Sequence, residues 1–179
     1  MAIDIGKLTG KVSPEFLADL QPLQRRAVEA AETVRHISHQ LHPSILDDIG
    51  LEAAVEQYSE EFQERSGIAT HFNSRDVPAS LPREVAGNVY HIFQECLRNV
   101  SKHSKSEEVF VTLEFSGGVL RLTVRDDGVG LAPERREAGT IGMVGMKERA
   151  HLVNGTVAIE SQSGEGTEVS VSVPIAAAG

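Results

Sequence analysis

Apolar residues recur in alternating steps of three and four positions along residues 20–41. The stripe consists of Leu20, Leu23, Ala27, Ala30, Val34, Ile37 and Leu41. This spacing is typical of the seam of a coiled coil or helix bundle, which needs a partner surface. The partner is either the rest of this chain or a second subunit; the periodicity does not choose between them, and we favour a second subunit. Pro43 ends or kinks this helix.

A second helix is predicted from about residue 44 to residue 65, with Gly67 placed to end it. Residues 68–72 then alternate apolar and polar side chains, as an edge strand does. Pro78 and Pro82 bound the loop that follows, and Pro82 stands at the first turn of a new helix. This part of the chain is therefore predicted as helix, strand and helix.

The helix after Pro82 has two distinct faces. Its apolar face carries Val85, Val89, Ile92, Phe93, Cys96, Leu97 and Val100. The adjacent polar face carries Glu95, Asn99, Lys102 and His103. The first of these faces is expected to enter a core and the second to face a ligand or solvent.

The remaining pattern predicts paired strands around one more helix. Strands are expected at residues 109–115 and 119–125, joined by a hairpin at 116–118. A helix is expected at 143–153, followed by two strands that are split at 164–167. This order predicts an α/β fold, a two-layer sandwich in which helices cover one face of a mixed sheet. The hairpin links do not fit a Rossmann crossover pattern.

Composition narrows the class of partner. The 179 residues, 40% of them hydrophobic, suffice for one ordinary domain and a smaller appendage. A net charge of -9 and only 4% aromatic residues argue against nucleic acid as a partner. A nucleotide would therefore need local amides, a metal ion and a few basic side chains.

Targeting signals and cysteine usage point to the cytosol. Cys96 is the single cysteine, which excludes an internal disulfide and a cysteine-based zinc cluster. Residues 1–12 lack the features of a signal peptide, and no apolar run is long enough to cross a bilayer. We expect a cytoplasmic chain without membrane contact of its own, and any membrane sensor to lie outside it.

Two polar clusters could hold a nucleotide. Glu95, Asn99 and Lys102 share one helical face, with His103 beside them, where they could address a metal and a phosphate chain. The alternative is a solvated helix face. Residues 126–130 read Asp-Asp-Gly-Val-Gly after a strand, and a carboxylate there could accept a hydrogen bond from the exocyclic amine of adenine. The alternative for this cluster is a plain turn.

Two glycine-rich segments complete the set. Residues 139–146 open a helix whose free amides would favour phosphate oxygens, although a simple helix cap would look the same. Residues 164–167 read Gly-Glu-Gly-Thr, where the Thr167 hydroxyl is available to a base or a bridging water. An ordinary hairpin is the alternative here.

In this order and spacing, residues 94–103, 126–130, 142–149 and 164–167 resemble the asparagine box and glycine boxes of histidine kinase ATP-binding domains. The Gly-Met-Lys-Glu-Arg run and short lid resemble the nitrate-sensor and DesK-like kinases that pair with LuxR-type response regulators. The resemblance covers about residues 34–174. It implies the Bergerat-type fold of the gyrase, chaperone, histidine kinase and MutL superfamily, with ATP and Mg²⁺ as cofactors.

The resemblance also implies residue roles. Asn99 is expected to ligate magnesium, and Glu95 to orient or deprotonate the acceptor. Lys102 and His103 match phosphate contacts, and Asp126 matches the aspartate that reads adenine. The remaining residues expected to contact ATP or shape its pocket and lid are Gly128, Gly130, Gly142, Met143, Gly145, Gly164, Gly166 and Thr167.

The chain departs from the family pattern in two places. The first glycine of the lid falls on Thr140, with Gly139 one place early. The acceptor motif, which ends Glu-Leu-His-Asp in this subfamily, is absent; residues 38–51 resemble instead the second bundle helix and its exit toward the ATP-binding domain. We therefore expect residues 1–66 to be a partial helical dimerisation and phosphotransfer region and residues 67–179 to be the ATP-binding domain. His42 is a minor candidate acceptor, whereas His36 and His39 are expected at the surface.

Three functions follow from this interpretation. The leading one is the Mg-ATP-binding catalytic domain of a sensor histidine kinase, acting as a homodimer on a histidine outside this chain. The second is a nucleotide-sensing dimerisation module that regulates a full kinase. The third is a serine-directed anti-sigma kinase, against which the exit segment at residues 46–51 argues.

Overall fold

The computed structural model describes residues 43–131 and 141–175. The predicted seam helix at 20–41 lies outside the described residues, as do His36, His39, His42 and the first two residues of the predicted lid, Gly139 and Thr140. Within the described ranges, no helix is both long enough and apolar enough to cross a membrane.

Five strands form one mixed sheet in the order β1-β2-β3-β5-β4. They are β1 (Ala69–Arg75), β2 (Glu108–Ser116), β3 (Val119–Asp126), β4 (Thr156–Gln162) and β5 (Gly166–Pro174). β1 runs parallel to β2, and the other neighbours are antiparallel. Gly117 and Gly118 both have positive φ (58° and 78°), as a tight two-residue hairpin requires. The predicted edge strand and both predicted hairpins are confirmed.

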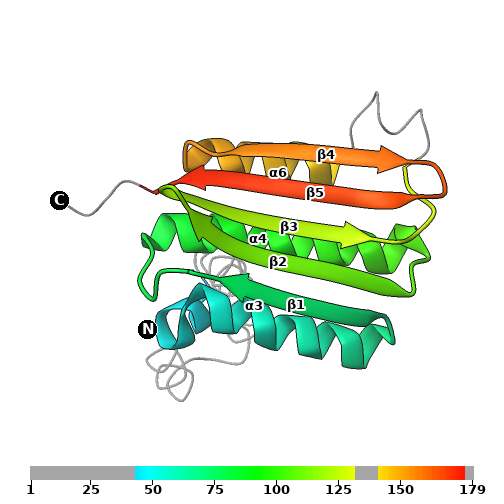
Figure 1. Ribbon diagram of the computed structural model, residues 1–179, viewed down its shortest axis with the longest axis horizontal. Helices are drawn as coiled ribbons and strands as arrows, with labels where there is room; N and C mark the ends of the chain where they lie inside the picture. The colour runs from blue at the N-terminus through cyan, green and yellow to red at the C-terminus, as the bar shows by residue number, and fades with distance from the viewer. Residues whose placement is uncertain (1–42, 132–140, 176–179) are drawn as a thin grey trace, which may run out of the picture. The chain divides into compact units, whose positions relative to one another are not determined.

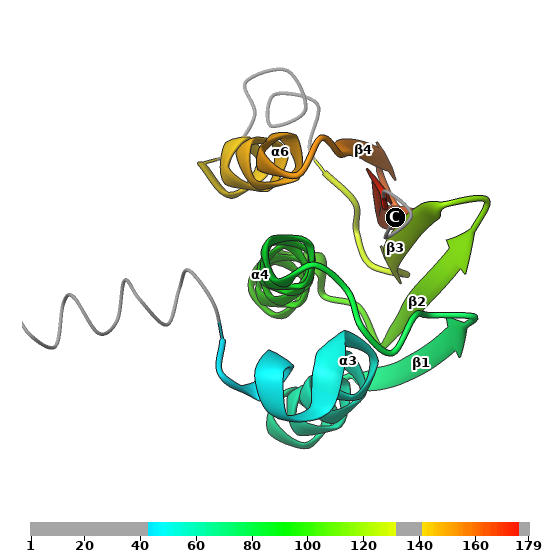
Figure 2. The ribbon, with the colours of Figure 1, turned by 90° about the vertical axis from the view of Figure 1, so that its left-hand side faces the viewer.

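The described α-helices cover one face of this sheet. They are α3 (Ile45–Ser66), α4 (Arg83–Asn99) and α6 (Ile141–Leu152). Figure 2 looks along the strands and shows these helices in one layer and the sheet in the other. Figure 1 shows α4 behind the middle of the sheet, with α3 near β1 and α6 near β4. The predicted two-layer α/β sandwich is confirmed.

The core lies between the two layers. Alternate residues of the three central strands face the helices and are buried: Val109, Val111, Leu113, Leu120, Leu122, Val124, Val169, Val171 and Val173. The apolar face predicted for the helix after Pro82 is buried against them. Leu51, Val55 and Phe62 of α3 join the same core, so this helix and the sheet share one packed interior.

Two features of the helices were not predicted. α3 is interrupted at Gly50, whose φ of 79° and ψ of 174° are not helical. α4 continues into a π-helical turn, η2 (Val100–Ser104), instead of an α-helical one. The Ser104 hydroxyl donates to the Val100 carbonyl at 2.8 Å, and Lys105 ends the turn with φ of 53°. π-turns are rare and are frequently found at functional sites.

Candidate functional site

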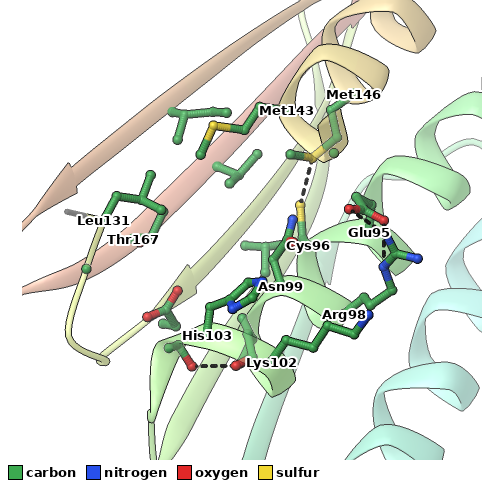
Figure 3. Close-up of a pocket in the computed structure, with 18 residues that line it drawn as sticks. Glu95, Cys96, Arg98, Asn99, Lys102, His103, Leu131, Met143, Met146 and Thr167 are labelled. Carbon is green, nitrogen blue, oxygen red and sulfur yellow. Dashed lines mark hydrogen bonds and ion pairs between the residues drawn. The ribbon is translucent and has the colours of Figure 1, made fainter. Parts of the chain in front are cut away.

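A cavity of about 260 Å³ lies where α4, η2 and the start of α6 meet the ends of β3 and β5. Figure 3 shows the side chains of all these elements converging on it. Most of the residues predicted from the four clusters line it: Glu95, Asn99, Lys102, His103, Asp126, Gly130, Gly142, Met143 and Thr167. Segments far apart in the sequence are therefore brought to one site, as the order of the clusters predicted.

Four predicted residues do not line the cavity: Gly128, Gly145, Gly164 and Gly166. A Cβ on Gly166 would overlap the Asp126 carbonyl oxygen and lie 2.8 Å from its carbon. A Cβ on Gly128 would lie 2.7 Å from the Ser104 carbonyl carbon. These two glycines act on the site indirectly, because their missing side chains let the β4–β5 hairpin approach β3 and the loop after β3 approach η2. Gly145 has open space around it.

The polar end of the cavity is built by α4 and η2. Glu95 and Asn99 are one helical turn apart on α4, so both point to the same side. Lys102 and His103 follow on η2 and are exposed at the cavity. An ammonium, an imidazole and an amide thus face one space, which suits a chain of phosphate oxygens.

Arg98 is a member of this polar end that the sequence interpretation missed. Its guanidinium contacts both oxygens of Glu95, with Nε 3.0 Å from Oε2 and Nη2 3.3 Å from Oε1. Figure 3 shows the pair beside the start of α6. A Cβ on Gly142 would overlap Glu95 Oε1 and lie 3.7 Å from Asn99 Nδ2. The carboxylate is therefore held between Arg98 and the first turn of α6.

The opposite end of the cavity contains a buried carboxylate. Asp126 is only 5% exposed at the end of β3. Burial raises the pKa of this carboxyl group; hydrogen bonds from the backbone N–H groups of Gly128 (3.0 Å) and Thr167 lower it, and the neighbouring Asp127 raises it. A buried acceptor that faces a cavity can select a ligand that carries an N–H donor.

The walls beside Asp126 are apolar. They are formed by Val124, Ile159, Val169, Met143, Met146 and Cys96. The Cys96 thiol lies 3.7 Å from the Met146 sulfur (Figure 3). Burial raises the pKa of Cys96 to about 12, so it stays a neutral thiol and does not act as a nucleophile. A flat, apolar ring with a polar edge fits this end.

Two serines also escaped the sequence interpretation. Ser104 accepts a hydrogen bond through its carbonyl oxygen from Val129 N–H at 2.8 Å, which ties the loop after β3 to η2. Ser161 of β4 contacts Thr167, Gly166 and Leu131. The sequence could have indicated Ser161 through its period-2 spacing with Val157 and Ile159. This spacing places a polar residue on the inward face of a strand.

The donors present fit a magnesium ion bound together with phosphates. Magnesium usually takes only one or two protein oxygens and completes its shell with water and phosphate oxygens. The Asn99 side chain carries one amide oxygen that could ligate the ion, and its Nδ2 and the Glu95 carboxylate both lie near Gly142. Among the described residues, no cluster of three or more His, Cys, Asp or Glu side chains could hold a metal by itself.

The combination of this fold with a buried aspartate at one end of the cavity and basic and amide side chains at the other defines a nucleotide-binding ATPase domain. Residues 84–177 match the model of the histidine kinase-, DNA gyrase B- and HSP90-like ATPase family, and the chain belongs to this family.

Two curated relatives are sensor kinases. The chain is 39% identical over 145 residues to the oxygen sensor histidine kinase NreB of Staphylococcus carnosus, covering 80% of this chain and 42% of NreB. It is 30% identical over 161 residues to the signal transduction histidine-protein kinase/phosphatase DegS of Brevibacillus brevis, covering 90% of this chain and 42% of DegS. The chain therefore spans about two fifths of these relatives. The chain is homologous to the ATPase domains of these histidine kinases, as the resemblance to nitrate-sensor and DesK-like kinases predicted.

Solved structures agree on the fold. The histidine kinase domain of the Erythrobacter litoralis EL346 blue-light activated histidine kinase superposes with a TM-score of 0.62 at 21% identity, over 97% of this chain and 94% of that domain. A second structure of the EL346 kinase gives a TM-score of 0.59 at 25% identity, over 88% of this chain and 50% of that one. Both likenesses support the predicted α/β fold.

Proposed function

We propose that this chain binds Mg-ATP and transfers the γ-phosphoryl group to a histidine outside the described residues. The observation that supports this most is the continuity of one cavity from buried Asp126 to Asn99, Lys102 and His103. A base, a sugar and a phosphate chain need such a path, because their two ends require opposite environments. The family supports ATP as the ligand, and the relatives NreB and DegS, which are named as histidine kinases, support the reaction class.

In this proposal the adenine ring enters the apolar end and its exocyclic amine donates to Asp126. The phosphates then extend toward η2, where Lys102 neutralises charge and His103 donates a hydrogen bond. Asn99 would hold a magnesium ion, which would offset the negative charge of the phosphates. Phosphoryl transfer needs mainly positioning and charge neutralisation, and the residues at this end of the cavity supply both.

Glu95 is proposed to orient or deprotonate the accepting imidazole. Its carboxylate lines the cavity on the same side of α4 as Asn99. Arg98 holds both carboxylate oxygens, so the direction of the carboxylate is restrained. A restrained carboxylate is better suited to orient an incoming imidazole than a freely rotating one.

The wider assembly is proposed from the sequence and the relatives. The apolar stripe at residues 20–41 would form a homodimer seam. A LuxR-type response regulator would receive the phosphoryl group, and the cytoplasm, where ATP is available, would be the site of action. NreB and DegS are named as histidine kinases, which supports a response regulator as the partner.

Calorimetric titration with ATP, with and without magnesium, tests the nucleotide site. Asn99→Ala should lose the magnesium-dependent part of binding, and Asp126→Asn should weaken binding about tenfold or more, since a hydrogen bond to a charged acceptor is lost. Asn88→Ala is the matched control, because Asn88 also lies on α4 but bonds the Glu84 carbonyl. Asp127→Asn controls for Asp126, since Asp127 bonds the amides of Glu107 and Glu108. Mg-ATP affinity that is unchanged in Asn99→Ala would sink the assignment.

Transfer is tested separately with labelled ATP and an acceptor-bearing helix from a related kinase. Acid-labile label on histidine is the expected product. Nucleotide binding without any transfer would favour the regulatory module, and acid-stable label on serine would favour the anti-sigma kinase. The two experiments thus separate binding from chemistry.

A further inference from the structure

Ser161 is placed to control the hydrogen-bonding character of the cavity, although it does not line it. It lies on β4 and is 9% exposed. Its hydroxyl oxygen is 2.9 Å from the Gly166 carbonyl oxygen, 2.8 Å from the Leu131 nitrogen and 3.0 Å from Thr167 Oγ1. Thr167 and Leu131 both line the cavity.

The positions of the protons follow from what each partner can do. The Gly166 carbonyl can only accept, so the single hydroxyl proton of Ser161 is donated to it. The Leu131 amide can only donate, and Ser161 accepts from it. Ser161 therefore has no proton left to donate to Thr167, its third partner. Thr167 must therefore donate its own hydroxyl proton to Ser161.

This leaves Thr167 without a donor for the cavity. Its backbone N–H is directed to the Asp126 carboxylate, and its hydroxyl proton to Ser161. What Thr167 Oγ1 can offer a ligand is a lone pair. Asp126 offers lone pairs as well, so both polar groups at this end of the cavity act as acceptors.

We propose that Ser161 is a positioning residue that sets base preference: by taking the hydroxyl proton of Thr167, it makes the base end of the cavity accept hydrogen bonds and not donate them. Asp126 and Thr167 are paired across β3 and β5, so an exocyclic amino group that faces both of them is then favoured over a carbonyl at the same position, as in hypoxanthine or guanine. The inference rests on the proposed function, since it assumes that the base occupies the Asp126 end.

Ser161→Ala separates this role from simple support of the fold. Without Ser161, the Thr167 hydroxyl is free to rotate and can donate to a carbonyl on the base. Loss of the hydrogen bonds to Leu131 and Gly166 should weaken the binding of every nucleotide by the same factor. Loss of the hydrogen bond between Ser161 and the Thr167 hydroxyl should instead change the relative affinity for different bases. The ratio of the ITP and ATP dissociation constants is therefore the informative quantity.

The experiment measures displacement of a fluorescent ATP analogue by ATP and by ITP, with magnesium present. In Ser161→Ala the ITP-to-ATP ratio should fall about fivefold, the size of one redirected hydrogen bond. Ser170→Ala is the matched control: it lies on β5 on the opposite face of the sheet, 3.5 Å from the Thr123 hydroxyl, and should keep the wild-type ratio.

Thr167→Val is the second variant and leaves Ser161 in place. Thr167→Val should also lower the ratio of the ITP and ATP dissociation constants. The double variant Thr167→Val/Ser161→Ala should show the same ratio as Thr167→Val alone, because the hydroxyl through which Ser161 acts is gone. An unchanged ratio in Ser161→Ala with intact ATP binding overturns this inference alone. A further shift in the double variant overturns it too. Absence of ATP binding by the wild-type chain overturns the proposed function and this inference together.

Discussion

Replacing Gly166 by alanine is expected to be among the most disruptive single-methyl changes in this domain. Gly166 has φ of +86°, a region in which an L-residue costs about 1–2 kcal/mol. Its Cβ would also overlap the Asp126 carbonyl oxygen and lie 3.2 Å from Asp127 Cα. Both neighbours are backbone atoms at the end of a central strand, so relief requires the chain to shift, at about 1–3 kcal/mol. The loss of unfolding free energy should total about 2–5 kcal/mol.

Gly164 provides the matched control for this prediction. It lies in the same hairpin with φ of +82°, but nothing lies within 4 Å of the Cβ it would carry. Gly164→Ala should therefore cost only the conformational part, about 1–2 kcal/mol. Urea denaturation followed by far-ultraviolet circular dichroism measures both variants, which suits a chain without tryptophan. Equal losses in the two variants would refute the argument that the approach of Gly166 to Asp126 matters.

The remaining predictions concern two other glycines and Asp126. The new methyl group of Gly142→Ala meets mainly the flexible Glu95 carboxylate, so the free energy of unfolding should change by less than about 1 kcal/mol. Displacement of that carboxylate should lower the rate of phosphoryl transfer about tenfold or more. Transfer at the wild-type rate would contradict this prediction. Gly145→Ala, in open space on α6, should raise the unfolding free energy by about 0.5–1 kcal/mol in the same urea assay; a loss of stability would count against it. Burial raises the pKa of Asp126 in the folded state, so its contribution to stability is full below the ordinary value of about 3.9 and is lost as pH rises through the raised pKa. Urea midpoints measured from about pH 4 upward should fall more for the wild-type chain than for Asp126→Asn, and parallel profiles would refute the shift.

Much of the fold follows from local patterns. The period-2 runs and the Gly117–Gly118 turn determined the strands, and the period of the helix after Pro82 determined which face is buried. These features need only neighbouring residues, because side-chain direction follows directly from helix or strand geometry. The observed bounds lie within a few residues of the predicted ones.

The sequence by itself also indicated the candidate residues of the site, since four clusters in a fixed order resemble the boxes of a nucleotide pocket. It did not show that Arg98 restrains Glu95, because an exposed arginine on a helix has many possible partners. Whether the roles assigned to the predicted site residues are correct stays a prediction until the variants are measured.

Only the tertiary structure decided the features that depend on contacts between distant segments. The π-turn at residues 100–104 is tied by its last carbonyl to Val129, and Ser161 acquires its role from Thr167 and Leu131 on other elements. Local periodicity contains no information on such contacts, because a hydroxyl or a carbonyl selects its partner only after the sheet has brought the segments together. The chain thus determined its elements locally, while the hydrogen-bonding character of the cavity was decided by packing.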